Sequence, residues 1–361
     1  MEKNLGIFIS IKHYQKLVNG NRKCSHYFYE KEASLNNISL YYISLPDVKI
    51  EKPIKTKALL FDPEQNIYRE EFIPLPRVIY NRVHLRRKKY RRMLKHMLDL
   101  GYEIYNSIPF YGKHIVNQYL GKNEVFHPFL PKTLTATKEN IHLMMKHFNQ
   151  LFVKPSYSSL GRGIMFIGKD KNQSWTLHYQ DHNKEWKQTA FSNSLPTTLL
   201  DAISKKPFIV QEKIPLATFN GRTFDTRVIV QRTASGEWAI TGMVGKLAQS
   251  GHNITNVGSG GDFAPIQTYL EGNRNFSPDV VRKRISELAL SVAHYLEQYC
   301  YHIADLGMDI GITDEGKPYF IECNFRSQYS GMETDSSLQD VCRNLYANPI
   351  RYGNYLLQQG S

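Results

Sequence analysis

The first 110 residues alternate short hydrophobic runs with polar or helix-periodic stretches. The runs are rich in β-branched and aromatic residues, as is typical of strands, and they cover residues 5–10, 39–43, 77–80 and 102–105. This alternation predicts an α/β domain with a small parallel sheet. Residues 52–75 are rich in proline and charge, and their pattern assigns them to no element.

A pair of strands around a loop of small residues follows a predicted helix at residues 137–148. The first strand ends at Lys154 and the second begins at Ile164. The loop between them contains Ser156, Ser158, Ser159, Gly161, Arg162 and Gly163. Glycine and serine let backbone N–H groups approach a phosphate closely, and the lysine and arginine add positive charge. A phosphate-binding loop and a plain glycine-rich hairpin are both compatible with this pattern.

Three further strands are predicted at residues 207–214, 224–230 and 238–247. The polar end of the first could present backbone donors and acceptors to an adenine ring. On the second, Asp225 and Arg227 share a face, because side chains two residues apart on a strand point the same way. They form either an ion contact of little energy or two ligand contacts, one to a ribose and one to a phosphate or carboxylate.

The segment 308–324 predicts a hairpin, because two β-prone runs flank a turn composition at residues 314–316. Glu322 and Asn324 share one face of the second strand, and Asp309 lies about opposite Glu322 or the residue before it. Two carboxylates and an amide oxygen are ligands that Mg²⁺ or Mn²⁺ prefers. A solvated strand face is the alternative.

Two helices are predicted near the C-terminus. Residues 277–296 begin with Ser277 as N-cap and Pro278 in the first turn, and they carry an apolar stripe that indicates a core helix. Residues 334–359 predict a helical tail that packs against the last domain.

Composition limits the class of protein. A chain of 361 residues with 41% apolar residues predicts a globular protein of two or three domains, and no segment approaches the length of a membrane span. The first residues predict a strand and not a signal peptide. Four widely separated cysteines form no CxxC pair, which predicts neither a disulfide framework nor a zinc site. A reducing, cytosolic setting is expected.

The net charge of +13 predicts an anionic partner or substrate. Much of this charge lies in the segment Arg82–Lys95, which also carries Tyr90, Leu94 and Met97 at helical spacing. The segment therefore predicts an amphipathic helix with a basic face. That face is either simply solvated or binds an anionic substrate or polymer.

The order of these motifs resembles the ATP-grasp superfamily over residues 110–330. The motifs are Lys113, Lys154 with the small-residue loop, Gln211-Glu212-Lys213-Ile214, Asp225-Thr226-Arg227, and Asp309 with Glu322-Cys323-Asn324. Within the superfamily the chain is most similar to the YheC/YheD family of endospore coat-associated proteins. That similarity rests on Tyr80-Asn81-Arg82, Asn106 before Lys113, and Leu130-Pro131-Lys132-Thr133.

The resemblance implies an ATP-grasp fold, in which two α+β lobes clamp ATP, preceded by an N-terminal α/β domain of the pre-ATP-grasp type. The implied domains are 1–110, 111–212 and 213–361. The lobes would bind ATP with Mg²⁺ or Mn²⁺. The implied nucleotide contacts are Lys113, Lys154, Ser156, Ser158, Ser159, Gly161, Arg162, Gly163, Gln211, Glu212, Lys213, Ile214 and Asp225. The implied metal ligands are Asp309, Glu322 and Asn324, and the implied acceptor contacts are Arg227, Lys246 and Asn256.

The implied activity is ATP-dependent ligation of a carboxylate to an amine through an acylphosphate. Charge neutralisation and positioning suffice for phosphoryl transfer, which agrees with a site built from lysine, arginine and metal. Two alternatives are a phosphotransferase and an ATP-binding spore structural or regulatory protein without catalysis. A nucleic-acid-binding module is a further alternative, suggested by the basic segment. The implied substrates are an acid, amino acid or peptide, and the implied location is the cytoplasm or the spore coat.

Overall fold

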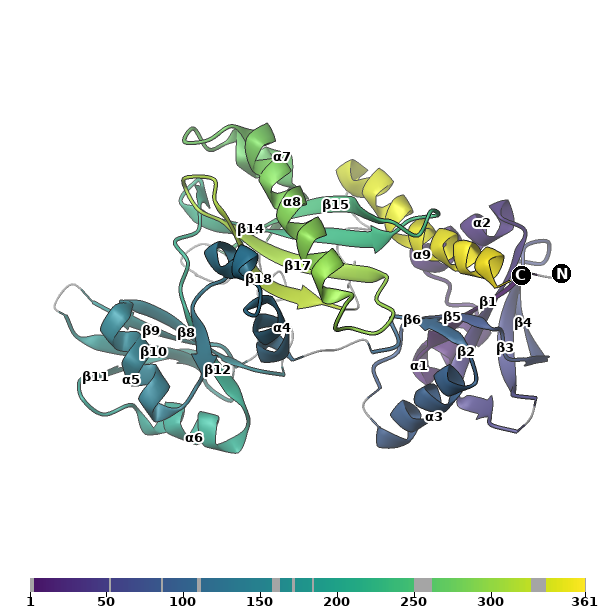
Figure 1. Ribbon diagram of the computed structural model, residues 1–361, viewed down its shortest axis with the longest axis horizontal. Helices are drawn as coiled ribbons and strands as arrows, with labels where there is room; N and C mark the ends of the chain where they lie inside the picture. Colours follow the sequence, from purple (N-terminus) through teal and green to yellow (C-terminus); the bar gives the residue numbers. More distant parts are fainter. Residues whose placement is uncertain are drawn as a thin grey trace.

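The computed structural model describes residues 3–51, 53–85, 87–108, 112–157, 163–170, 173–183, 185–249, 262–325 and 336–360, apart from the side chain of Lys113. Three six-stranded sheets dominate this part of the chain, each built from a separate stretch of sequence (Figure 1). The fold is therefore mixed α/β, as the hydrophobic pattern predicts.

The N-terminal sheet has the strand order β4-β3-β2-β1-β5-β6. Its strands are β1 (Lys3–Ile9), β2 (Ile38–Lys49), β3 (Lys55–Asp62), β4 (Ile67–Pro74), β5 (Val78–Asn81) and β6 (Glu103–Tyr105), and its helices are α1 (Ile11–Val18), α2 (Cys24–Leu35) and α3 (Lys88–Asp99). The pairs β1–β2, β1–β5 and β5–β6 are parallel, as predicted. Residues 52–75, which the sequence pattern left unassigned, form β3 and β4. These strands pair antiparallel because short connections link consecutive strands.

The second sheet has the order β11-β10-β9-β8-β12-β7. Its strands are β7 (Thr133–Thr135), β8 (Gln150–Pro155), β9 (Met165–Lys169), β10 (Trp175–Gln180), β11 (Trp186–Phe191) and β12 (Phe208–Glu212), and its helices are α5 (Lys138–His147) and α6 (Thr197–Lys205). Both helices pack on one face, where Leu151 and Val153 of β8 are buried with Ile141 and Leu199. The alternate residues of β8 therefore point to the opposite face.

The third sheet has the order β16-β15-β14-β17-β18, with β13 paired to β14. Its strands are β13 (Thr218–Phe219), β14 (Arg222–Arg232), β15 (Trp238–Leu247), β16 (Asp262–Pro265), β17 (Asp305–Ile312) and β18 (Pro318–Asn324). The accompanying helices are α4 (Lys113–Leu120), the 3₁₀ helix η1 (Glu124–Phe129), α7 (Ile266–Glu271) and α8 (Pro278–Leu296). The predicted apolar stripe of α8 is buried against this sheet.

Helix α9 (Gln339–Gln359), preceded by the short 3₁₀ helix η4 (Ser336–Leu338), joins two parts of the molecule. The prediction of a helical tail is confirmed, but its packing is broader than expected. Leu345 and Ile350 of α9 share one buried cluster with Leu5 of β1 and with Ile229 of β14. The helix accordingly runs from the third sheet to the N-terminal sheet (Figure 1).

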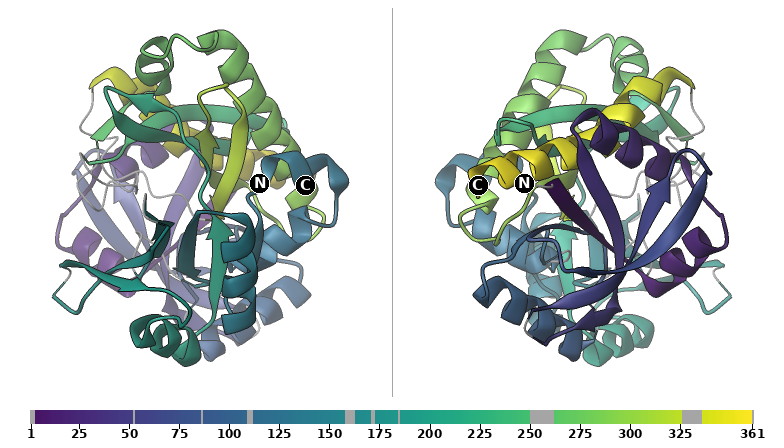
Figure 2. Two further views of the ribbon diagram at one scale, coloured as in Figure 1. Left: turned by 90° about the vertical axis from the view of Figure 1, so that its left-hand side faces the viewer. Right: turned by 90° about the vertical axis from the view of Figure 1, so that its right-hand side faces the viewer.

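The second sheet lies beneath the third in both end-on views of Figure 2. Helix α8 covers one face of the third sheet, and α9 covers part of the other face beside Ile229 and Val244. The remainder of that second face carries polar residues, because Arg227 and Asp225 follow Ile229 at two-residue intervals toward the start of β14. This arrangement gives the third sheet a polar surface on the face opposite α8.

Candidate functional site

The hairpin of β17 and β18 brings the predicted metal ligands together. Asp309 pairs with Glu322, as one of the two predicted registers required, and Gly307 pairs with Asn324. Paired residues share a face of the sheet, so the two carboxylates lie on the same side as Asn324. The Asn324 Nδ2 atom donates to Glu322 Oε1 at 3.3 Å.

Two cations from β14 and β15 meet the same carboxylates. Arg227 donates to Asp309 through Nε at 2.5 Å and through Nη2 at 3.1 Å, which makes a two-point contact. The Lys246 Nζ atom lies 3.0 Å from Asp225 Oδ1 and 3.2 Å from Asp309 Oδ2. We name Asp225, Arg227, Lys246 and Asp309 the charged cluster. The resemblance divides these residues among ribose, acceptor and metal, whereas the structure joins them on one sheet face.

Burial and charge act in opposite directions on the charged cluster. Burial alone would raise the pKa of Asp309, but Arg227 and Lys246 hold that pKa well below its usual range. Burial alone would lower the pKa values of Arg227 and Lys246, and attraction to Asp309 and Asp225 instead raises both. Asp309, Arg227 and Lys246 are therefore ionised at neutral pH, and they stabilise one another.

The donor set beside the charged cluster suits a hard divalent cation. Three carboxylates (Asp225, Asp309 and Glu322) against two cations leave one net negative charge when all are ionised. Within the described ranges, no group of three or more His, Cys, Asp or Glu side chains could hold a metal ion by itself. Asp309 and Glu322 with the Asn324 amide oxygen nevertheless fit Mg²⁺, which binds few protein oxygens and keeps other positions for water or phosphate.

A second set of polar side chains lies on the face of the second sheet opposite α5 and α6. The Lys154 Nζ atom donates to Gln211 Oε1 at 2.8 Å, and Gln211 Nε2 donates to Thr133 Oγ1 at 2.9 Å. Lys154 and Gln211 were both predicted nucleotide contacts. The register pairs Gln211 with Thr133 on one side and with Phe152 on the other, so these three side chains share a face.

Two phenylalanines on this face were not among the predicted site residues. Phe152 pairs with Phe166, their rings lie 5.7 Å apart, and Lys154 Nζ and Lys213 Nζ lie 5.0 Å and 5.2 Å from the respective ring centroids. Burial lowers the pKa of Lys213. The signal for Phe152 was its spacing from Lys154, since residues two apart on a strand share a face.

Hydrogen bonds to neighbouring segments fix the backbone at the end of β12. The Glu212 N–H donates to Lys132 O at 3.0 Å, and Glu212 Oε1 accepts the Lys132 N–H at 2.9 Å. The Lys213 N–H donates to Gln150 O at 3.0 Å. Among the residues that the structure describes, none accepts a hydrogen bond from the Ile214 N–H. The predicted adenine contact of the Glu212 and Ile214 backbone stays a prediction.

Several predicted contacts lie outside the described residues: Ser158, Ser159, Gly161, Arg162 and Asn256. Lys113 starts α4, but its side chain is likewise not described. At the edges of the small-residue loop, Ser156 is buried and donates its N–H to Pro207 O at 2.9 Å, and Gly163 has φ +73°. Glycine suits that left-handed conformation better than other residues.

The basic segment Arg82–Lys95 is an amphipathic helix only from Lys88 onward, because α3 begins there and Arg82 and Arg87 precede it. Leu94 and Met97 of α3 are buried in the core of the N-terminal domain, with Tyr90 partly buried beside them. The exposed side chains include Arg87, Lys88, Lys89, Arg91, Arg92 and Lys95. Arg82 differs, because it lies nearer the core and its Nη1 atom is 3.3 Å from Asp305 Oδ2.

The chain matches a family model described as YheC/D like ATP-grasp over residues 101–356. It is 27% identical over 307 residues to the endospore coat-associated protein YheD of Bacillus subtilis, covering 82% of this chain and 66% of that relative, slightly less than two thirds. It is 20% identical over 318 residues to YheC of the same organism, covering 85% of each.

Solved structures show the same fold at low sequence identity. The ATP-grasp ligase PsnB, complexed with a precursor variant, Mg and ADP, has a TM-score of 0.52 at 12% identity, covering 98% of this chain and 99% of that chain. The VanG D-Ala:D-Ser ligase from Enterococcus faecalis has a TM-score of 0.52 at 12% identity, covering 98% of this chain and 100% of that chain.

Proposed function

Because the chain belongs to the YheC/D-like ATP-grasp family, we propose that it is an ATP- and Mg²⁺-dependent ligase that joins a carboxylate to an amine. The observation that carries the proposal is the charged cluster beside Glu322 and Asn324, on the face of the third sheet opposite α8. Cations and carboxylates gathered in this way supply the charge balance that phosphoryl transfer needs.

The proposed nucleotide site spans both lobes. Lys113 and Lys154 would contact the α- and β-phosphates, and the loop of residues 158–163 would cover the β- and γ-phosphates. The backbone of Glu212 and Ile214 would bind the adenine. The Ile214 N–H has no recorded hydrogen bond to a described residue, which is compatible with this assignment. The remaining proposed contacts are the aromatic face of Phe152 and Phe166, the polar side chains of Ser156, Gln211 and Lys213, and Asp225 near the ribose.

Asp309, Glu322 and Asn324 would hold one or two Mg²⁺ ions. When bound, the metal supplies a positive charge that neutralises phosphate oxygens. Arg227 and Lys246, with the loop that contains Asn256, would orient the acceptor carboxylate. Both cations already bind carboxylates in this structure, so an acceptor would have to share them with Asp309 or Asp225.

The proposed reaction has two steps. An acceptor carboxylate oxygen attacks the γ-phosphorus of ATP, the bond to the β,γ-bridging oxygen breaks, and ADP leaves. An amine nitrogen then attacks the acyl carbon, the C–O bond to phosphate breaks, and the nitrogen loses a proton. Arg227 and Lys246 would offset the negative charge of the acceptor as it approaches the phosphates. No protein nucleophile is needed, and Cys323 packs against the hydrophobic core.

The proposed substrate is an acid, amino acid or peptide with negative charge. The exposed basic face of α3 would contact a polyanionic partner or a spore-coat component. We further propose that the protein acts in the cytoplasm and associates with the spore coat. The second part rests on its relatives YheD and YheC, which are named endospore coat-associated proteins. No helix in the described ranges has the length and apolar character needed to span a membrane.

The test is release of ADP from ATP and Mg²⁺ with pooled amino acids, short peptides and dicarboxylates. We expect acceptor-dependent ADP in the wild type, no ADP in Glu322→Ala, and normal activity in Glu287→Ala, which changes an exposed carboxylate on α8. Mass spectrometry of the product separates a ligase from a phosphotransferase. Tight ATP binding without ADP from any pool would favour a non-catalytic binding protein, and absence of ATP binding would refute the nucleotide site.

A further inference from the structure

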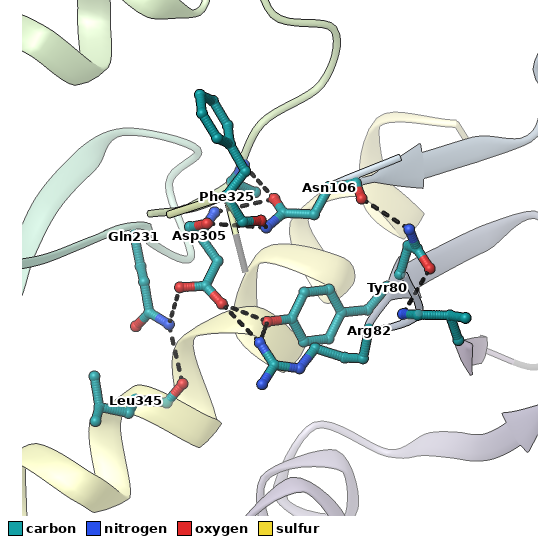
Figure 3. A network of polar contacts seen from close by, with 10 residues as sticks. Tyr80, Arg82, Asn106, Gln231, Asp305, Phe325 and Leu345 are labelled. Carbon is teal, nitrogen blue, oxygen red and sulfur yellow. Dashed lines mark hydrogen bonds and ion pairs between the residues drawn. The ribbon is translucent and has the colours of Figure 1, made fainter. Parts of the chain in front are cut away.

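Asn106, which directly follows β6, lies at the centre of a buried polar network between the N-terminal domain and the third sheet (Figure 3). Its Oδ1 atom accepts the N–H groups of Ala304 at 2.7 Å and Asp305 at 3.1 Å. Its Nδ2 atom donates to the carbonyl oxygens of Asp305 at 2.9 Å and Phe325 at 2.8 Å. An amide has two acceptor and two donor positions, so this side chain is fully used.

These bonds hold the open end of the hairpin that carries the predicted metal ligands. Asp305 is the first residue of β17, and Phe325 directly follows Asn324, the last residue of β18. The β17–β18 ladder ends at the pair Gly307–Asn324. Asn106 connects the two strands just beyond that pair, which is the last that the described residues form. The amide therefore links β17 to the end of β18 at this end of the hairpin.

The Asp305 side chain ties the same point to the end of β5 and to β14. Its carboxylate accepts from Tyr80 Oη at 2.6 Å, from Arg82 Nη1 at 3.3 Å and from Gln231 Nε2 at 3.2 Å. Gln231 also donates to Leu345 O of α9 at 3.0 Å. The network thus fixes the carboxyl ends of β5 and β6 against β14, β17 and α9.

The network and the charged cluster lie on one continuous face of the third sheet. Asp305 pairs with Gln231 and Asp309 pairs with Arg227, so both pairs occur in the same register of β14 and β17. Four residues of strand separate them, about 13 Å at roughly 3.3 Å per residue. A shift at Asn106 would move the end of β18 directly, because only one peptide bond separates Phe325 from Asn324.

We propose that Asn106 is a positioning residue for the ligand site: it fixes the carboxyl end of β18 so that Asn324 stays beside Glu322. The inference rests on the proposed function, since Asn324 is a proposed metal ligand. With Asn106 in this role, the binding of a divalent cation and of nucleotide depends on the contact between the N-terminal sheet and the third sheet. Asn106 acts through the backbone of Phe325 and touches no ligand itself.

The first test replaces Asn106 with aspartate, which has the same size and tolerates the observed φ of 51°. Aspartate cannot donate, so an oxygen would face the carbonyl groups of Asp305 and Phe325. We expect binding of Mn²⁺ in the presence of ADP to weaken at least tenfold. The bound Mn²⁺ is measured by electron paramagnetic resonance, at a temperature where circular dichroism shows the variant folded.

Two controls separate positioning from stability. Asn37→Asp changes an exposed asparagine with a similar φ of 54°, and it should leave both stability and binding unchanged. Tyr80→Phe removes one hydrogen bond to Asp305 but leaves the contact with Phe325, so it should lower stability and alter binding less than twofold. Equal loss of binding in Tyr80→Phe and Asn106→Asp would overturn the proposal.

A second measurement uses the wild-type chain and so does not depend on folding of a variant. Hydrogen–deuterium exchange of the amides of Ala304 and Asp305 should slow when Mg²⁺ and ADP are added, because their acceptor is Asn106. Unchanged exchange with bound ADP would contradict the coupling. If the wild type binds neither Mn²⁺ nor ADP, the proposed function itself is wrong; if it binds and Asn106→Asp binds equally well, only the positioning role is wrong.

Discussion

Replacing Arg227 with methionine should destabilise the third sheet strongly at neutral pH. The change removes both hydrogen bonds to Asp309, whose side chain is only 9% exposed. A hydrogen bond to a charged group contributes about 1.5–3 kcal/mol, so two give about 3–6 kcal/mol. Lys246 stays 3.2 Å from Asp309 and keeps part of the charge balanced. We therefore expect a loss near the lower limit, about 3 kcal/mol.

The loss should depend on pH in a defined direction. Arg227 holds the pKa of Asp309 below its ordinary value of 3.8 in the folded protein. A lowered folded-state pKa contributes stability that is present above the unfolded-state pKa and disappears as the pH falls below it. The difference between wild type and Arg227→Met should consequently be largest near pH 7 and shrink below about pH 4.

Urea unfolding followed by tryptophan fluorescence is a suitable assay. The chain has three tryptophans, and replacing Trp175 and Trp186 with phenylalanine leaves Trp238, which is buried in β15 of the third sheet. Lys283→Met is the matched control, because Lys283 contacts Glu287 at 3.9 Å on the exposed face of α8. That pair should contribute less than about 1 kcal/mol. Equal, small losses in both variants would refute the importance of the charged cluster.

Three further predictions concern other parts of the molecule. Lys154→Met should weaken ATP binding at least about tenfold in calorimetry, because it removes a proposed phosphate contact while leaving the buried face of β8 unchanged. Burial, with a smaller contribution from Arg232, lowers the pKa of His302, although Glu103 Oε2 lies 3.3 Å from its Nδ1 atom and opposes the shift. Stability should therefore fall as the pH drops below about 6.5, and His302→Gln should flatten this dependence. Replacing the exposed cations of α3 with glutamine should weaken polyanion binding and reduce its salt dependence, as measured by fluorescence anisotropy at several salt concentrations. The residues to change are Lys88, Lys89, Arg91 and Arg92.

Each of these has a specific control. Lys169→Met changes a lysine at the end of β9 and should not alter ATP binding. His96→Gln changes an exposed histidine on α3 and should leave the pH dependence of stability as it is. Replacing Lys12 and Lys16 of α1 with glutamine should not alter polyanion binding. If these replacements weaken binding as much as those on α3, net charge is responsible and α3 is not the binding surface.

Local patterns predicted much of the fold because each followed from neighbouring residues. The bounds of β15 match the predicted strand, and the pairing of Asp309 with Glu322 follows from a hairpin whose turn composition is evident. Thr137 caps α5 by accepting the Asn140 N–H, which places the helix start where it was expected. Such features depend on spacing and on local propensity alone.

The arrangement of the site was less accessible to prediction because it depends on long-range register. Arg227 and Asp309 are 82 positions apart, and only the β14–β17 pairing places them together. Asn106 contacts Phe325 across 219 positions, through a loop conformation that no local pattern indicated. Such contacts arise from packing of whole elements, which a single sequence does not specify by its periodicity.

The shared cluster of α9 and β1 has a consequence for synthesis on the ribosome. Leu5 and Ile7 of the first strand pack with Leu345 and Ile350, so the N-terminal domain cannot complete this core until more than 300 further residues have been translated. Domains generally fold in order as they emerge. Here the N-terminal sheet should be among the last parts to become fully stable, and a chain truncated before α9 should expose an apolar surface to chaperones and proteases.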